Sequence, residues 1–167
     1  MVLHALHSAR TQGQAKGVVR LIRDAKPADM PAINRLSAEL GYALAPQDVA
    51  GQRVADILGS EVDHLWVFEA DNHIKGWIHL FVARRVASPP FAEIGGLVVS
   101  SDCRGKGIGR SLVTYAKAWA KTQGLIIRVR CNIKRNDAHL FYQKMGLSPK
   151  KKQIVFEADI DPAVSIR

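Results

Sequence analysis

Residues 104–109 read Arg-Gly-Lys-Gly-Ile-Gly, a basic and glycine-rich run that suits the binding of phosphate. Glycines let the backbone bend so that consecutive N–H groups point at one anion, and a following helix adds partial positive charge at its N-terminus. The side chains of Arg104, Lys106 and Arg110 add full positive charges. The run therefore predicts a site for a pyrophosphate group, with a tight turn between a strand and a helix as the alternative.

Two common phosphate-binding loops are excluded by their spacing. A Walker loop ends in Gly-Lys-Ser or Gly-Lys-Thr, and neither tripeptide occurs in the chain. A dinucleotide-binding fingerprint needs G-x-G-x-x-G and an acidic residue about 20 residues later, whereas the next strand-like run ends in Cys131-Asn132. What the run does match is R-x-x-G-x-G, carried by Arg104, Gly107 and Gly109.

A second segment lies one helix and one strand further along the chain. It consists of Asn132, followed by Asn136-Asp137-Ala138-His139-Leu140-Phe141-Tyr142-Gln143-Lys144-Met145-Gly146-Leu147. The two segments together resemble the GNAT superfamily of N-acetyltransferases. The first is similar to its acetyl-CoA loop and the second to its N…N-x-x-A-x-x-F-Y-x-x-x-G-[FL] segment, with the alanine one place early. The resemblance covers roughly residues 18–161.

The resemblance implies that acetyl-CoA is the acetyl donor and that the chain is an enzyme. The loop from Arg104 to Arg110 is expected to hold the donor's pyrophosphate, and the backbone N–H groups of Leu97 and Val99 its pantetheine arm. The oxyanion is expected near the Val99 N–H. Asn136 is also expected to cap a short helix. The expected cofactor-binding residues are Leu97, Val98, Val99, Arg104, Gly105, Lys106, Gly107, Ile108, Gly109, Arg110, Asn132, Asn136 and Tyr142.

Acyl transfer from a thioester to an amine also needs a base for the amine and an acid for the thiolate. The resemblance favours Tyr142 as the acid, since the family places a tyrosine near the CoA sulfur and a phenol is protonated at neutral pH. A packing tyrosine is the alternative. The resemblance makes Glu93 the candidate base, with a solvent-facing glutamate as an equal alternative. His79 is the second candidate base, although a hydrogen-bonded core histidine explains it better.

The composition predicts one soluble globular domain, since the chain has 167 residues, 47% of them hydrophobic and 23% charged. The net charge of +9 has three interpretations: attraction of CoA phosphates, attraction of an acidic acceptor or nucleic acid, and simple solubility. No RNA-binding motif occurs, which disfavours a nucleic acid partner. Residues 1–17 are basic and without a clear period. We expect them to form a flexible extension before a single domain over residues 18–167.

The remaining patterns exclude several other kinds of site. Cys103 and Cys131 form no disulfide framework, which favours a cytoplasmic location. The six histidines are scattered and the cysteines lack ligand spacing, so no metal site is expected. No G-x-S-x-G elbow occurs. The apolar runs are too short to span a membrane, and no signal peptide is evident.

These residues need a scaffold, and the hydrophobic periodicity predicts an α/β mixed sheet with helices on both faces. The tripeptide 71–73 predicts a hairpin, and Ser88-Pro89-Pro90 predicts a break in the chain. The resemblance adds a GNAT fold, a mostly antiparallel mixed sheet whose fourth and fifth strands splay apart around the pantetheine arm. Strands are expected over residues 18–23, 64–70, 74–84, 91–99, 125–132 and around 153–157, and helices over residues 27–40, 46–58, 107–123 and 137–145.

The sequence therefore predicts an acetyl-CoA-dependent N-acetyltransferase that acts by direct attack in a ternary complex. Its acceptor is a small-molecule or protein amine that the sequence does not identify. We expect the first two helices and residues 85–90 to form the binding site for the acceptor. These segments carry no recognisable motif. A non-catalytic acyl-CoA sensor and a basic nucleic-acid-binding protein are the alternatives, and a homodimer is left open.

Overall fold

The computed structural model describes residues 19–41 and 43–159, and the expected extension over residues 1–17 lies outside them. A five-stranded sheet runs in the order β1-β2-β3-β4-β5. Strands β1 to β4 pair antiparallel with their neighbours, and β5 pairs parallel with β4. The mixed, mostly antiparallel sheet is confirmed. The strands are β1 (Arg20–Asp24), β2 (Asp63–Ala70), β3 (His73–Arg85), β4 (Ser88–Val99) and β5 (Ile127–Val129).

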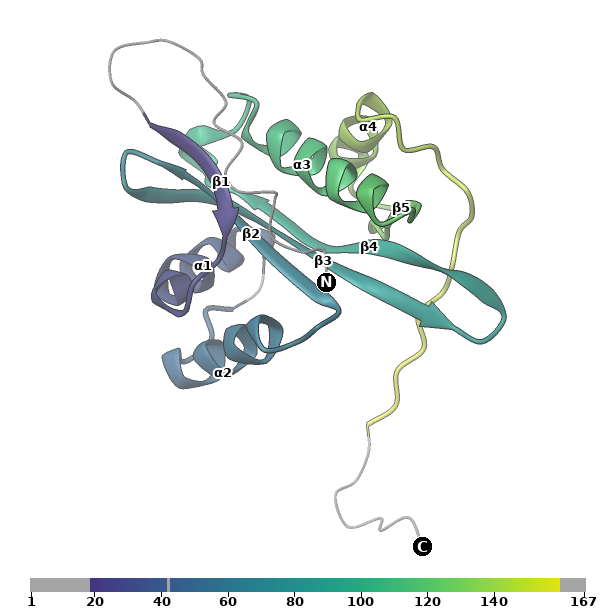
Figure 1. Cartoon of the computed structure of the whole chain (residues 1–167), viewed down its shortest axis with the longest axis horizontal. Coiled ribbons are helices and arrows are strands. Elements are labelled where there is room, and N and C mark those ends of the chain that lie inside the picture. The colour runs from purple at the N-terminus through teal and green to yellow at the C-terminus, as the bar shows by residue number, and fades with distance from the viewer. Residues whose placement is uncertain (1–18, 42, 160–167) are drawn as a thin grey trace, which may run out of the picture.

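Helices cover both faces of the sheet, as expected (Figure 1). On one face lie α1 (Met30–Ser37) and α2 (Gln47–Leu58), and on the other lie α3 (Ile108–Thr122) and α4 (Asn136–Lys144). Short 3-10 turns complete the list: η1 (Pro27–Asp29), η2 (Ala38–Leu40) and η3 (Ser101–Cys103). Within residues 19–41 and 43–159, every helix is too short or too polar to cross a membrane.

Side chains alternate between the two faces of the sheet along each strand, so that each face has its own hydrophobic core. Ile78 and Leu80 of β3 are fully buried in one cluster with Leu112 of α3. Trp77 of the same strand lies in a second cluster with Ile33 of α1. Successive side chains of a strand point to opposite faces, so odd-numbered residues of this part of β3 face α1 and α2. Whether a residue of this part of β3 has an odd or an even number therefore decides on which face its side chain lies.

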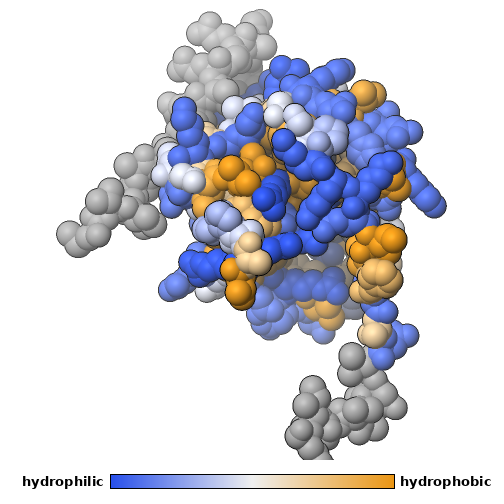
Figure 2. All heavy atoms as spheres, turned by 90° about the vertical axis from the view of Figure 1, so that its right-hand side faces the viewer, coloured by the Kyte–Doolittle hydropathy of each residue, from blue (hydrophilic) through white to orange (hydrophobic). Residues whose placement is uncertain are grey.

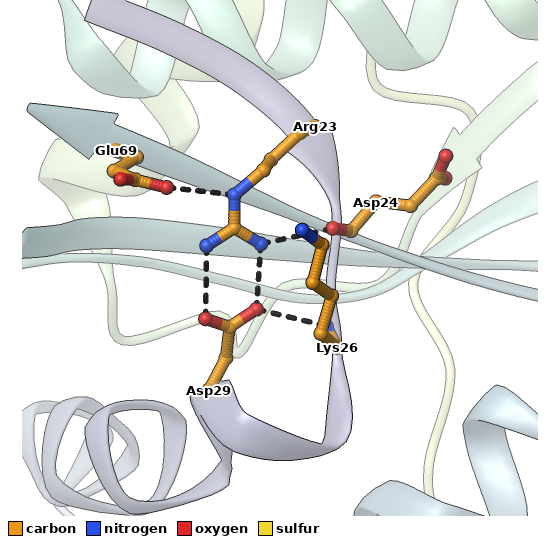
Figure 3. A network of polar contacts seen from close by, with 5 residues as sticks. All are labelled: Arg23, Asp24, Lys26, Asp29 and Glu69. Atoms are coloured by element: carbon orange, nitrogen blue, oxygen red, sulfur yellow. Dashed lines mark hydrogen bonds and ion pairs between the residues drawn. The ribbon is translucent and has the colours of Figure 1, made fainter. Parts of the chain in front are cut away.

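A charged network ties β1 to the start of α1 (Figure 3). The Arg23 guanidinium donates to both carboxylate oxygens of Asp29, at 2.7 and 2.9 Å, and to Glu69 of β2 at 2.7 Å. The Lys26 N–H donates to Asp29 at 2.8 Å. Burial acts to raise the pKa of Asp29, but these donors outweigh burial and hold that pKa below its ordinary value. The network therefore fixes the position at which the chain leaves the sheet for α1.

The expected break at Ser88-Pro89-Pro90 is wrong, because these residues begin β4. Ser88 pairs with Arg85 across a two-residue turn, and the β3–β4 register shifts between Ala83 and Arg85. Proline lacks an N–H group and is tolerated in strands at such irregularities and at free edges. This end of β4 also lies beyond its pairing with β5, which begins at Ala92.

The expected last strand around residues 153–157 is also wrong, because this run has no regular structure. A strand needs a partner for its backbone groups. Within the part of the chain that the structure describes, no strand pairs with residues 153–157. The fifth strand is shorter than the expected residues 125–132, since β5 pairs with only three residues of β4.

We expect Asp29→Asn to lower the free energy of unfolding by about 2 kcal/mol, because a desolvated Arg23 would lose a bidentate ionic partner. Urea denaturation at pH 7 measures the change. Asp48→Asn, in the exposed first turn of α2, is the control and should cost under about 1 kcal/mol. Equal losses in both variants would show that the Arg23–Asp29 pair adds no net stability.

Candidate active site

Strands β4 and β5 separate after a short pairing. Residues 92–94 of β4 pair with β5, and β4 then continues for five residues without a partner strand on that side among the described residues. At Gly95 the register between β3 and β4 shifts, so this residue is an extra one in β4. Such a bulge bends a strand and increases its twist. The splayed fourth and fifth strands expected from the sequence are present as this separation.

The separation leaves backbone donors of β4 without strand partners. The Ser100 N–H donates to the Lys75 carbonyl of β3 at 2.9 Å. Since N–H groups alternate in direction along an extended chain, those of Leu97 and Val99 point to the other side, into the gap. These two amides can therefore donate to a ligand that lies along β4.

A cavity of about 650 Å³ opens at the gap. It brings together several of the expected cofactor-binding residues, although their roles stay predictions. Neither Asn132 nor Tyr142 contributes to its walls. The lining residues are Glu39, Leu40, Leu97, Val98, Val99, Arg104, Lys134, Arg135, Asn136, Asp137 and Ala138.

The glycine-rich loop has the backbone that its sequence predicts. Gly105 and Gly107 have φ of 75° and 84°, in the left-handed region that favours glycine. Gly107 is the N-cap of α3, and no side chain caps this helix. The first N–H groups of α3 are therefore open to an anion, and the helix dipole adds positive charge there. The buried Ile108 anchors the loop in the core under α3.

Two cations of the loop are already engaged by oxygen atoms of the protein. Arg104 Nη2 lies 2.8 Å from Glu39 Oε2, and Lys106 Nζ donates to the Asp102 carbonyl at 2.8 Å. The Ser101 hydroxyl also donates to Glu39, at 3.0 Å. A bound pyrophosphate would compete with Glu39 for Arg104. Sequence analysis missed Glu39, because no pattern links a residue of η2 to a loop 65 positions away.

Tyr142 lies on α4, half-buried against the core under α3. Its ring meets that of Phe141 edge to face, with centroids 5.2 Å apart. Burial raises the pKa of Tyr142 to about 12, with a further rise from Cys131 and a smaller opposing effect of Arg135. The phenol therefore keeps its proton at neutral pH, which a proton donor requires.

The two expected asparagines shape the entry to α4. Asn136 is the first residue of α4, and its predicted role as the N-cap is wrong, since Arg135 holds that position without a side-chain cap. Asn132 accepts the Lys134 N–H on its side-chain oxygen at 2.9 Å and the Arg135 N–H on its carbonyl at 3.0 Å. Asn132 thus stabilises the turn between β5 and α4.

Glu93 is buried beside the point at which the strands separate, with 4% of its surface exposed. The alternative of a solvent-facing glutamate is wrong. Ile94 points into the core under α3, so Glu93 points to the face that carries α1 and α2. Arg130 Nε, just beyond β5, donates to its carboxylate. Sequence analysis missed Arg130, because the β4–β5 register that brings it to Glu93 is not visible in one sequence.

His79 lies on the same face and has a carboxylate partner that sequence analysis missed. Its Nε2 lies 2.7 Å from Asp63 Oδ1. Burial acts to raise the pKa of Asp63, but hydrogen bonds with Ser60 and His79 outweigh burial and lower it. The other ring nitrogen of His79 faces Gly95, where a Cβ atom would lie 2.7 Å from it. His79 is thus hydrogen-bonded, as expected, and oriented toward the bulge of β4.

Comparison with known protein families agrees with this arrangement. Residues 29–147 match the model of the acetyltransferase (GNAT) family. A curated relative is the Uncharacterized N-acetyltransferase YhdJ of Bacillus subtilis (strain 168), 42% identical over 57 residues. The aligned part is 33% of this chain and spans 40% of the length of that relative.

Solved structures share the fold over most of the chain. The aminoglycoside N-acetyltransferase AAC(6')-Iy, in complex with CoA, has a TM-score of 0.77 and 17% identity, covering 87% of this chain and 98% of its own. Glucosamine-6-phosphate N-acetyltransferase from Arabidopsis thaliana has a TM-score of 0.72 and 20% identity, covering 84% and 99%. At these identities, the likeness shows the fold alone.

Proposed function

The chain belongs to the acetyltransferase (GNAT) family, and we propose that it transfers an acetyl group from acetyl-CoA to a primary amine by direct attack in a ternary complex. The observation that carries this proposal is the gap between β4 and β5, with open amides on one side and the glycine-rich loop at its end. The complex of AAC(6')-Iy with CoA supports the assignment of the donor, since that protein has the same fold.

The residues around the gap fit the charge and the shape of acetyl-CoA, which supplies an acetyl thioester when bound. Arg104, Lys106 and Arg110 match a pyrophosphate, together with the open N–H groups at the start of α3. The Leu97 and Val99 N–H groups match the amide carbonyls of a pantetheine arm. Arg104 would exchange the Glu39 carboxylate for a phosphate oxygen.

Acid and base approach the gap from opposite faces of the sheet. Glu93, oriented by Arg130, accepts a proton from the acceptor amine, directly or through water, while the amine nitrogen attacks the acetyl carbon. His79, oriented by Asp63, is the second candidate base. The Val99 N–H stabilises the oxyanion. Tyr142 donates its proton to the sulfur as the carbon–sulfur bond breaks.

Direct attack is supported by the state of the two thiols. Cys103 and Cys131 are both free, with Cys103 buried in η3 and Cys131 half-buried after β5. Cys103 packs into the core under α3, and a cysteine buried in this way is shielded from an acyl donor. We also propose that the protein acts in the cytoplasm, and the free thiols support this location.

The acceptor class is tested by thiol release from acetyl-CoA with a panel of amines. The panel contains aminoglycosides, glucosamine 6-phosphate and lysine peptides, because two structural neighbours are named for the first two kinds of acceptor. Turnover with one class identifies the acceptor. If acetyl-CoA binds tightly but releases no thiol with any amine of the panel, the protein is an acyl-CoA sensor and not an enzyme.

We expect Gly107→Glu to weaken acetyl-CoA binding by roughly 100-fold or more, because a carboxylate would stand where the phosphate meets the open amides. Isothermal calorimetry measures the affinity. Gly124→Glu is the matched control, since Gly124 also has a positive φ, 66°, but lies at the other end of α3. Unchanged affinity in a folded Gly107→Glu variant would remove the loop from the donor site.

We expect Tyr142→Phe to lower kcat by about 10- to 1,000-fold while acetyl-CoA affinity changes little, because only the proton donor is lost. With the pKa of Tyr142 at about 12, the wild-type rate should show no alkaline loss from this group below about pH 11. Steady-state kinetics across pH tests both points. Full activity of the variant would assign protonation of the thiolate to water.

We expect Glu93→Gln to slow the reaction most at low pH, where the acceptor amine depends most on a base. The rate should recover toward the wild-type value as pH approaches the pKa of the amine. His79→Gln is made in parallel, and the pH–rate profiles are compared. If only His79→Gln changes the profile, the base is His79; an unchanged profile in both variants would leave water as the base.

A further inference from the structure

Two exposed arginines at one end of the sheet have no carboxylate partner in the part of the chain that the structure describes. Arg85 is the last residue of β3, and Arg128 is the middle residue of β5. By contrast, the guanidinium groups of Arg23, Arg104 and Arg130 each pair with a carboxylate of the protein. Arg85 and Arg128, called the arginine pair below, therefore carry positive charges that a ligand can meet.

One aromatic ring holds both members of the arginine pair. The Cζ atoms of Arg128 and Arg85 lie over the Phe91 ring, 4.0 and 5.3 Å from its centroid. Phe91 is a fixed support, since only 1% of its surface is exposed. A guanidinium that stacks on a ring uses its flat face, so that the N–H donors in its plane stay open to an anion. Phe91 thus positions two cations without occupying their donors.

The arginine pair lies on the same face of the sheet as the candidate base Glu93. Phe91 precedes Glu93 by two residues in β4, and side chains two apart in a strand point to the same face. Arg128 is the residue of β5 that lies opposite Glu93 in the register of the two strands. A ligand over Phe91 is therefore a direct neighbour of the group proposed to deprotonate the acceptor.

Solvent has access to this end of the sheet. The hairpin between β3 and β4 extends beyond the helices that cover the two faces (Figure 1). Figure 2 looks onto this end of the molecule, where hydrophilic residues surround a smaller number of hydrophobic ones. The hairpin also contains residues 85–90, which the sequence analysis expected at the acceptor site. A charged acceptor can thus approach the arginine pair from water.

We propose that the arginine pair binds an anionic group of the acceptor, so that the substrate is a small primary amine that also carries a phosphate or a carboxylate. This inference rests on the proposed acetyl transfer. Arginine binds both kinds of anion through two parallel hydrogen bonds. Since Phe91 and Glu93 are two residues apart in one strand, the anion and the amine of the substrate should be separated by roughly 7 Å.

The same charges select against a polycationic acceptor. An aminoglycoside would meet two positive charges that no carboxylate of the described residues neutralises. Like charges brought together at a binding site oppose association. Among the amines of the panel described above, glucosamine 6-phosphate therefore fits this site better than an aminoglycoside does.

The proposal is tested with two pairs of amines that differ in the anion alone: glucosamine 6-phosphate against glucosamine, and 6-aminohexanoate against hexylamine. Steady-state kinetics of the full chain with acetyl-CoA give kcat/KM for each amine. The wild type should prefer the anionic member by roughly 100-fold, mainly through KM. Arg85→Gln and Arg128→Gln should each reduce this preference by roughly 10-fold, because each removes one charged donor.

Arg84→Gln is the matched control. Arg84 is exposed in the same hairpin, but it is one residue away from Arg85 and so points to the other face of the sheet. The variant loses the same charge, yet the preference should stay within about 2-fold of the wild type, since exposed charges at a distance are screened. Circular dichroism checks that the variants fold. A partly unfolded variant would lose activity with both members of a pair, so the preference reports recognition and not stability.

A preference for the anionic amine in at least one pair, reduced in Arg85→Gln and in Arg128→Gln but not in Arg84→Gln, supports the proposal. The pair that shows this preference identifies the anion as a phosphate or a carboxylate. A wild-type protein that prefers the anionic amine in neither pair overturns the proposal. A preference that either arginine variant leaves unchanged, or that Arg84→Gln reduces equally, also overturns it.

Isothermal calorimetry distinguishes failure of this inference from failure of the proposed acetyl transfer. Glucosamine 6-phosphate and 6-aminohexanoate are titrated into the full chain in the presence of CoA. If no amine is acetylated, but one of these compounds binds and its affinity falls in Arg85→Gln and Arg128→Gln, the anion site is supported and the acetyl transfer is wrong. If neither compound binds and neither is acetylated, the anion site is overturned as well.

Discussion

The separation of β4 from β5 depends on close packing of two aromatic rings against two glycines. A Cβ atom at Gly95 would lie 2.7 Å from the His79 ring, and one at Gly96 would lie 2.7 Å from the Trp77 ring. Only residues without a side chain fit there, and they allow the extra residue that bends β4 away from β5. The open amides of Leu97 and Val99 follow from this bend, and the cavity opens beside them.

The same bend explains why the candidate acid and base come from different layers of the fold. Tyr142 approaches from the core under α3, whereas Glu93 and His79 lie on the face that carries α1 and α2. A continuous sheet would keep these groups apart. At a gap between strands, a donor held along β4 can be reached from both faces, so an amine can attack from one side while the sulfur leaves on the other. This geometry suits direct transfer.

The sequence predicted well those features that depend on residues close together along the chain. The loop from Arg104 to Arg110, the helix after it and the Phe141-Tyr142 pair each have local signatures of glycine placement and helical period. What it missed depends on register. Asp63 reaches His79 through a hairpin whose pairing shifts at Phe68. Arg130 and Glu39 meet their partners across 37 and 65 positions. The strand expected over residues 153–157 has the right composition, but composition does not supply a partner.

A pairing of three residues is too short to hold a strand by backbone hydrogen bonds alone. Side-chain contacts on both faces of the sheet also hold β5 beside β4 where the two strands pair. Ile127 and Val129 pack into the core under α3.

On the other face, the Arg128 guanidinium stacks on the buried Phe91 ring at 4.0 Å, and Arg130 pairs with Glu93. Glu93 thus serves two purposes: it joins the strands just before they part, and it presents a carboxylate where they part. A glutamine at position 93 would weaken this contact between the strands as well as remove the proposed base. Only a change in the pH profile, and not a simple loss of rate, can therefore assign the proton transfer to this residue.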